Sequence, residues 1–249
     1  MDIAGSVAIV TGSGSGIGRA IALELARSGA RVACCGRRAD RLDETVAAIV
    51  AAGGEGLARP TDVTVRSQVQ ALVQGVLEAW GQIDVLFNNH GSFNSIAGVH
   101  ESDPDTWWHD VTVNLQGAYL TVREALPHMM ARDRGIIVNM DGGRPVGGTG
   151  YACGKAGLME LTRVLVEELK MEGSAVIALT AGPGLVRTEM TELQVETEAG
   201  RKWIPSTKES FDAGNLRRPE DIAVATVRAL ETAAPEHAGK GFGPGFEGF

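Results

Sequence analysis

The sequence has no long apolar run and no block of like charge. Its apolar stretches fall well short of the ~20 residues that a membrane span needs, and no basic region precedes the short apolar run at the N-terminus. We therefore expect neither a membrane association nor a signal peptide, which makes the cytoplasm the default location. The net charge of −8, without a basic stripe, argues against a nucleic-acid partner.

Cysteine and histidine are also sparse. The three cysteines cannot form a disulfide framework, and the adjacent Cys34 and Cys35 lie in an apolar run where packing is the expected role. The five histidines are scattered and show no HExxH spacing, and there is no CxxC pair. No metal site is expected.

What the sequence does contain is an alternation of short apolar runs and helical stripes. Strands are expected at 7–10, 31–35, 83–87, 135–138 and 175–179, and a further strand before residue 62. A long helix is expected from about 104 to 131, and another follows residue 151. The pattern predicts one α/β domain over residues 1–249, a doubly wound, Rossmann-like parallel sheet with helices on both faces. The pattern stops between about 189 and 216, which suits a mobile flap over a site.

A glycine-rich turn, TGSGSGIG at 11–18, lies between the first expected strand and the first helix. In that position Gly12 permits a tight turn, Gly16 lets the backbone approach a pyrophosphate, and Gly18 lets the helix pack on the sheet. The helix N-terminus, with about half a positive charge, then faces the phosphates. A P-loop is excluded, because no Gly-Lys-Ser/Thr follows.

Together with the Tyr151-x-x-x-Lys155 pair, this turn resembles the short-chain dehydrogenase/reductase family over almost the whole chain. Further motifs occur in the same order as in the family: Asp62-Val63, NNHG at 88–91, VNLQG at 113–117 and GPGLVRT at 182–188. The resemblance implies a cofactor site built from Gly12, Ser13, Ser15, Gly16, Ile17, Gly18, Asp62, Val63, Asn89, Gly91, Tyr151, Lys155, Pro183, Gly184, Val186 and Thr188. It also implies homo-oligomers, either dimers or tetramers.

The end of the second expected strand bears on which nicotinamide cofactor is bound. Gly36 stands where an acidic residue would bind the ribose 2′-hydroxyl, and Arg37 and Arg38 follow it. Two guanidinium groups can pair with a 2′-phosphate, so NADP is predicted over NAD. A solvated helix start is the alternative interpretation of the two arginines.

Tyr151 and Lys155 lie four residues apart on one helix, so their side chains share a face. A free phenol titrates near 10, and a fixed ammonium favours the phenolate, so Tyr151 is the predicted acid/base. The resemblance assigns Lys155 to the nicotinamide ribose and Asn114 to a water relay. The predicted function is the interconversion of a carbonyl and a secondary alcohol on a small organic substrate.

The family's serine is missing from residues 139–155, and Asp141 and Gly142 align with the usual serine pair. Loss of one donor to a developing oxyanion costs about 10²–10³ in rate. Three side chains could substitute for the serine: His90 is the first candidate, and Thr149 and Arg144 are the others. Asp141 is expected to point away or to bind a water. Leu179 also departs from the family, which usually has asparagine there.

Two other functions stay open. The missing serine permits a non-catalytic NADP-binding sensor or scaffold, and the same fold also permits an NAD-dependent alcohol dehydrogenase.

Overall fold

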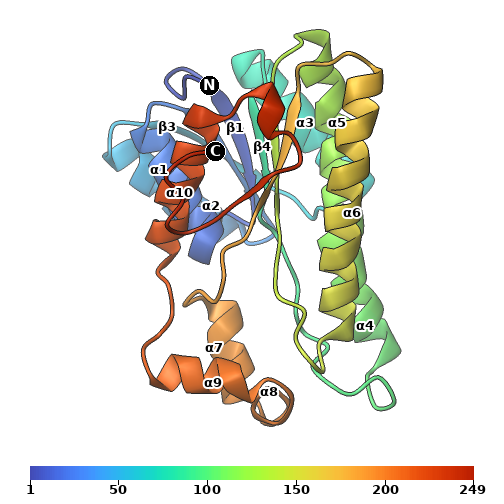
Figure 1. Cartoon of the computed structure of the whole chain (residues 1–249). Helices are drawn as coiled ribbons and strands as arrows, with labels where there is room; N and C mark the ends of the chain where they lie inside the picture. The colour runs from blue at the N-terminus through green and yellow to red at the C-terminus, as the bar shows by residue number, and fades with distance from the viewer.

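The computed structural model describes all 249 residues and contains one seven-stranded, fully parallel sheet. The strand order is β3-β2-β1-β4-β5-β6-β7 (Figure 1). The strands are β1 (Val7–Thr11), β2 (Arg31–Gly36), β3 (Glu55–Pro60), β4 (Val85–Asn88), β5 (Ile136–Met140), β6 (Ile177–Ala181) and β7 (Gly241–Phe242). The predicted doubly wound α/β fold is confirmed.

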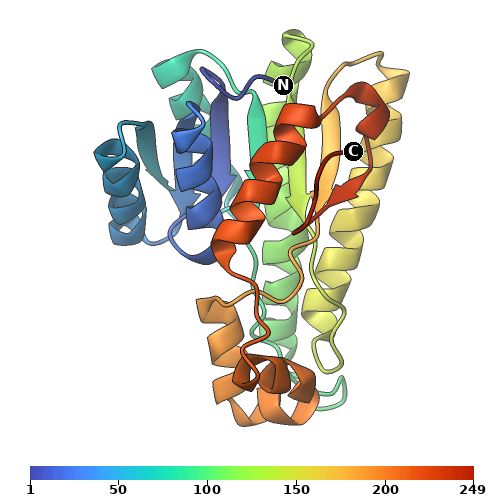
Figure 2. The same cartoon turned by 60° about the vertical axis from the view of Figure 1, so that its left-hand side comes forward.

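Helices cover both faces of this sheet. One face carries α1 (Gly16–Arg27), α2 (Ala39–Ala51) and α10 (Pro219–Thr232). The other carries α3 (Arg66–Trp80), α5 (Gly117–Ala131) and α6 (Thr149–Met171) (Figures 1 and 2). No helix is both long enough and apolar enough to cross a membrane.

The sheet has an apolar core on each face, because successive side chains of a buried strand point to opposite faces. In β1, Ala8 and Val10 face the core beneath α1 and α10, whereas Val7 and Ile9 face the core beneath α3 and α5. Cys34 and Cys35 likewise point into opposite cores as free thiols, and burial raises their pKa values to about 11 and about 12. The expected packing role of the two cysteines is therefore observed.

Two expected elements differ in detail from the structure. The long helix predicted from 104 to 131 consists of α4 (Pro104–Val111), the π-helical turn η1 (Thr112–Gln116) and α5. The expected flap is not irregular but forms α7 (Glu189–Glu196), α8 (Glu198–Trp203) and α9 (Pro205–Asp212). Residues 189–212 are called the lid below.

The lid lies beyond the carboxyl ends of the strands, apart from the layers of the sheet (Figures 1 and 2). Its two ends are joined, because Val186 and Arg217 form a parallel bridge. The Arg187 N–H donates to Arg217 O at 3.0 Å, and the Arg217 N–H donates to Leu185 O at 3.0 Å. Ligands of open α/β sheets bind at this edge, so the fold places the lid over the expected site.

Candidate active site

The glycine turn after β1 adopts the backbone that the sequence predicted. Gly12 and Gly16 have φ values of +67° and +52°, which favour glycine. A Cβ at Gly18 would overlap Gly12 O and the Asn89 side chain, so only glycine lets α1 pack so closely on the turn. The Asn89 amide donates to Thr11 O at 3.0 Å and thereby joins the turn to the end of β4.

The first turn of α1 suits an anion. Ser15 precedes the helix but its side chain makes no capping hydrogen bond. The first intrahelical bond runs from the Arg19 N–H to Ser15 O, so the N–H groups of residues 16–18 are left for another acceptor. These N–H groups and the positive end of the helix dipole fit a dinucleotide pyrophosphate.

Further residues of the expected cofactor site lie at the same edge. Ser13 is buried, and its N–H donates to Cys35 O at 3.1 Å. Asp62 holds its loop by accepting from the Thr64 N–H at 2.9 Å, and Val63 is buried. Arg38 reaches back to the turn and donates to Ser15 Oγ at 3.0 Å.

His90 is held beneath the site. Its Nδ1 lies 2.7 Å from Thr11 Oγ1, and its Nε2 is buried, without a hydrogen-bond partner, against the backbone of Gly117. Burial, and to a smaller extent the charge of Lys155, lowers the pKa of His90 to about 3, so the ring is neutral. This geometry does not support the hypothesis that His90 replaces the serine, because Nδ1 is engaged by Thr11 and Nε2 is buried against Gly117.

Asn114 lies in the π-helical turn η1, a kind of irregularity that is frequent at functional sites. Its amide donates to Ser92 O and to Asp110 O, both at 2.7 Å. The buried carboxylate of Asp110 accepts from the Ser92 hydroxyl at 2.5 Å and from the Ser95 N–H at 2.8 Å. Asp110 therefore orders the loop that carries residues 92–95 beside Asn114.

Tyr151 and Lys155 occupy the first two turns of α6, on one face. The Lys155 ammonium is buried and donates to Met140 O at 2.9 Å, while its Nζ lies 5.9 Å from the Tyr151 ring centroid. Phe93 stacks on that ring, with centroids 4.7 Å apart and planes inclined by 23°. The phenol ring therefore packs on an aromatic ring and lies near a cation.

Burial moves both pKa values away from their usual ranges. It raises the pKa of Tyr151 to about 12, with a smaller contribution from Asp141. It lowers the pKa of Lys155 to about 8, and the positive charge of Arg144 acts in the same direction. In the cofactor-free chain Tyr151 is therefore a protonated hydrogen-bond donor at neutral pH.

The Tyr151 hydroxyl occupies the space where residue 142 would place a side chain. A Cβ at Gly142 would overlap the hydroxyl oxygen. No group of the chain hydrogen-bonds to this hydroxyl, and its oxygen is accessible to solvent instead of buried. Glycine at 142 thus leaves the hydroxyl room to meet a ligand.

The remaining substitutes for the serine are already engaged. Arg144 pairs with Asp141 at 2.9 Å and donates to the carbonyls of Gly142 and Gly143. Asp141 therefore turns toward Arg144, and its orientation relative to a substrate stays a prediction. The Thr149 hydroxyl accepts from Trp107 Nε1 at 2.9 Å.

A buried polar chain beneath the site was not predicted. The Thr121 hydroxyl donates to the Asn88 side chain at 2.7 Å, and Asn88 donates to Asn139 at 2.9 Å. Asn139 then donates to the Thr162 hydroxyl at 2.9 Å. These bonds tie β4 and β5 to α5 and α6, the helices beside Asn114 and Tyr151.

The lid begins directly opposite the glycine turn. The side chain of Thr188 lies 3.2 Å from the position a Cβ would take at Gly16, and Pro183, Gly184 and Val186 lead into it from β6. Farther along the lid, in α8, Trp203 packs against Gly98 and Gly147, and Lys202 pairs with Glu101 at 3.1 Å. The lid therefore contacts both the glycine turn and the loop before α6.

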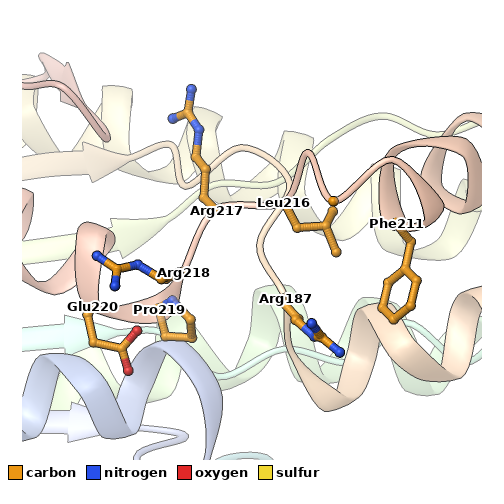
Figure 3. A pocket seen from close by; sticks show the side chains of 8 residues that line it. Arg187, Phe211, Leu216, Arg217, Arg218, Pro219 and Glu220 are labelled. Carbon is orange, nitrogen blue, oxygen red and sulfur yellow. The ribbon is translucent and has the colours of Figure 1, made fainter.

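Two hollows flank the site. One of about 220 Å³ lies at the base of the lid, where Arg187 lies over the Phe211 ring at 5.3 Å. Figure 3 shows that the guanidinium groups of Arg187, Arg217 and Arg218 point in different directions there. The other, of about 540 Å³, extends from Asp141 to the C-terminal residues 241–246. Neither is lined by Tyr151 or the glycine turn.

The structure thus brings the predicted Tyr151, Lys155, Asn114 and glycine turn to one edge of the sheet. Phe93 and Asp110 were missed. Asp110 could have been found, because it precedes Asn114 by one helical turn, whereas nothing in the sequence marks Phe93 as a partner of Tyr151.

Comparison with known proteins agrees with this geometry. The family model described as short chain dehydrogenase matches residues 6–199. A 3-oxoacyl-(acyl-carrier-protein) reductase of Thermotoga maritima is 32% identical over 230 residues, which cover 90% of this chain and 89% of that protein.

Two solved structures extend the likeness to the whole fold. An actinorhodin polyketide ketoreductase variant with NADPH superposes with a TM-score of 0.86 at 28% identity, covering 96% of this chain and 95% of the other. A short chain dehydrogenase/reductase of Burkholderia phymatum in complex with NAD gives a TM-score of 0.85 at 28% identity, covering 98% and 90%.

Proposed function

Because the chain belongs to the short-chain dehydrogenase/reductase family and is an oxidoreductase of that family, we propose that it is an NADP-dependent reductase of a ketone on a small organic substrate. The observation that carries the proposal is the Tyr151 hydroxyl, which is protonated, free of hydrogen bonds within the chain, and carried by a ring that stacks on Phe93 and lies near Lys155. Relatives named as reductases of 3-oxoacyl and polyketide substrates support a ketone as the reacting group.

In this proposal each side chain has one task. When bound, the nicotinamide supplies a hydride to the carbonyl carbon. Tyr151 donates its proton to the carbonyl oxygen, and the nearby Lys155 ammonium stabilises the phenolate that remains. Asn114, fixed by Ser92 O and Asp110 O, holds the turn of helix beside Lys155. Tyr151 is then the one hydroxyl that polarises the carbonyl.

The cofactor preference rests on the end of β2. Gly36 offers no carboxylate to a ribose, and Arg37 and Arg38 offer two cations to a 2′-phosphate. Solved structures of this fold contain NADPH in one case and NAD in another. The preference for NADP is therefore inferred from the arginines and not from these structures. Assembly into dimers or tetramers stays a prediction.

The test is oxidation of NADPH and of NADH against a panel of carbonyl compounds that includes a β-ketoacyl thioester. We expect turnover that favours NADPH and loses that preference in Arg37→Ala. Tight NADPH binding without turnover on any compound would favour a sensor or scaffold instead. An unchanged preference in Arg37→Ala would show that the arginines do not select the cofactor.

A further inference from the structure

The arginine that reaches the glycine turn also reaches the lid. Arg38 lies at the start of α2, and its Nη2 donates to Ser15 Oγ at 3.0 Å and to Glu189 Oε2 at 3.1 Å. Glu189 is the first residue of α7, 151 positions along the chain. One guanidinium nitrogen therefore bridges the glycine turn and the lid.

The carboxylate of Glu189 lies in a cationic corner. Besides pairing with Arg38, it contributes to the raised pKa of Arg41, which is due mainly to Glu44. Thr188, its neighbour, packs against Gly16. These contacts place an anionic group of the lid among the residues expected to surround a 2′-phosphate.

We propose that Glu189 competes with the 2′-phosphate of NADP for Arg38, so that this cofactor detaches the start of the lid while NAD leaves it attached. The inference rests on the proposed function only for the role of Arg38. A carboxylate and a phosphate cannot both be close to the same guanidinium without repulsion, and the phosphate carries the larger charge. Displacement of Glu189 removes the single ion pair between α7 and α2.

The pair is suited to such an exchange because it is accessible. The side chains of Arg38 and Glu189 are 50% and 53% exposed, so the pair is weak and is readily replaced by a stronger anion. A buried pair would resist the exchange, since breaking it would leave an unpaired charge.

The experiment uses 2′,5′-ADP, which carries the 2′-phosphate without nicotinamide, and 5′-AMP, which lacks it. Affinities are measured by calorimetry at low ionic strength on the full chain and on Glu189→Gln. We expect Glu189→Gln to bind 2′,5′-ADP about two- to five-fold more tightly, with 5′-AMP unchanged, and the gain to shrink in high salt.

Glu192→Gln is the matched control. Glu192 also lies in the first turn of α7, but it pairs with Arg187 at 3.4 Å instead of with Arg38. It should leave both affinities unchanged. Hydrogen exchange in residues 189–196 should rise on binding 2′,5′-ADP and not on binding 5′-AMP.

Three results would overturn the inference: an unchanged or weaker affinity of Glu189→Gln for 2′,5′-ADP, an equal gain for 5′-AMP, or the same gain in Glu192→Gln. The variant Arg38→Ala distinguishes a failure of this inference from a failure of the proposed NADP preference. If Arg38→Ala leaves 2′,5′-ADP binding unchanged, the role of Arg38 in NADP preference is wrong. If it weakens binding while Glu189→Gln has no effect, only the competition is wrong.

Discussion

The floor of the active site and the lid above it are held by different kinds of contact. The floor comprises Asn114, Tyr151 and Lys155 with their supports, and Asn114 and Lys155 are only 1% and 2% exposed. The lid is attached at its first residue and through α8 by the exposed pairs Arg38–Glu189 and Lys202–Glu101. Buried polar contacts are costly to break, whereas exposed pairs contribute little. The floor is therefore built to keep one geometry and the lid to exchange partners.

The largest effect that sharpens this comparison is expected at Gly142. Gly142→Ala should lower kcat/KM about 100-fold, because its Cβ overlaps the Tyr151 hydroxyl. A catalytic group displaced by about 1 Å typically loses about 100-fold in rate. Gly143→Ala is the control, since a Cβ there meets only Pro145, at 3.9 Å. Steady-state kinetics of both variants check this. An increase in activity in Gly142→Ala or Gly142→Ser would contradict the account of the missing serine.

The buried polar chain gives the next effect. Thr162→Val leaves the buried Asn139 amide without its acceptor, which should lower the free energy of unfolding by about 1–3 kcal/mol. Thr232→Val removes a hydroxyl that donates one turn back, to Arg228 O, on an exposed stretch of α10. Urea unfolding should show little change in the free energy of unfolding of Thr232→Val. Equal losses of this free energy in the two variants would contradict the distinction between buried and exposed contacts.

His90, in the floor of the site, should make the free energy of unfolding depend on pH. Its pKa is about 3 in the folded chain and about 6.5 when unfolded, so only the unfolded chain gains the proton between these values. The free energy of unfolding should fall by about 1.6 kcal/mol between pH 6.5 and pH 5 because of His90 alone.

The measurement is urea unfolding at both pH values. His90→Ala should lose this part of the pH dependence, and His128→Ala, on an exposed part of α5, should keep it. An unaltered pH dependence in His90→Ala would show that His90 is solvated.

The smallest effect is expected in the lid. Lys202→Gln removes the pair with Glu101 and should change the free energy of unfolding by about 0.5 kcal/mol or less, because both side chains are exposed. Thermal unfolding checks this. A loss comparable to that of Thr162→Val would mean that the lid is as firmly attached as the floor.

The sequence predicted the parts of the molecule that depend on local patterns. The apolar runs predicted five of the seven strands to within two residues of their bounds, and the Tyr151–Lys155 spacing correctly placed these two residues on one face of α6. The direction of the His90 ring was not predictable, because Thr11 and Gly117 come from distant segments. The lid was missed as helices, since these are short and polar and carry no apolar stripe.

The central claim is that Tyr151 is the proton donor. The chain has two tyrosines, and Tyr119 on α5 is 47% exposed, so Tyr119→Phe is a matched control. The decisive measurement is kcat/KM for NADPH-dependent reduction of an active ketone by both variants. The account predicts a loss of about 10³-fold in Tyr151→Phe and less than about two-fold in Tyr119→Phe. Retention of more than about a tenth of the activity in Tyr151→Phe would contradict it.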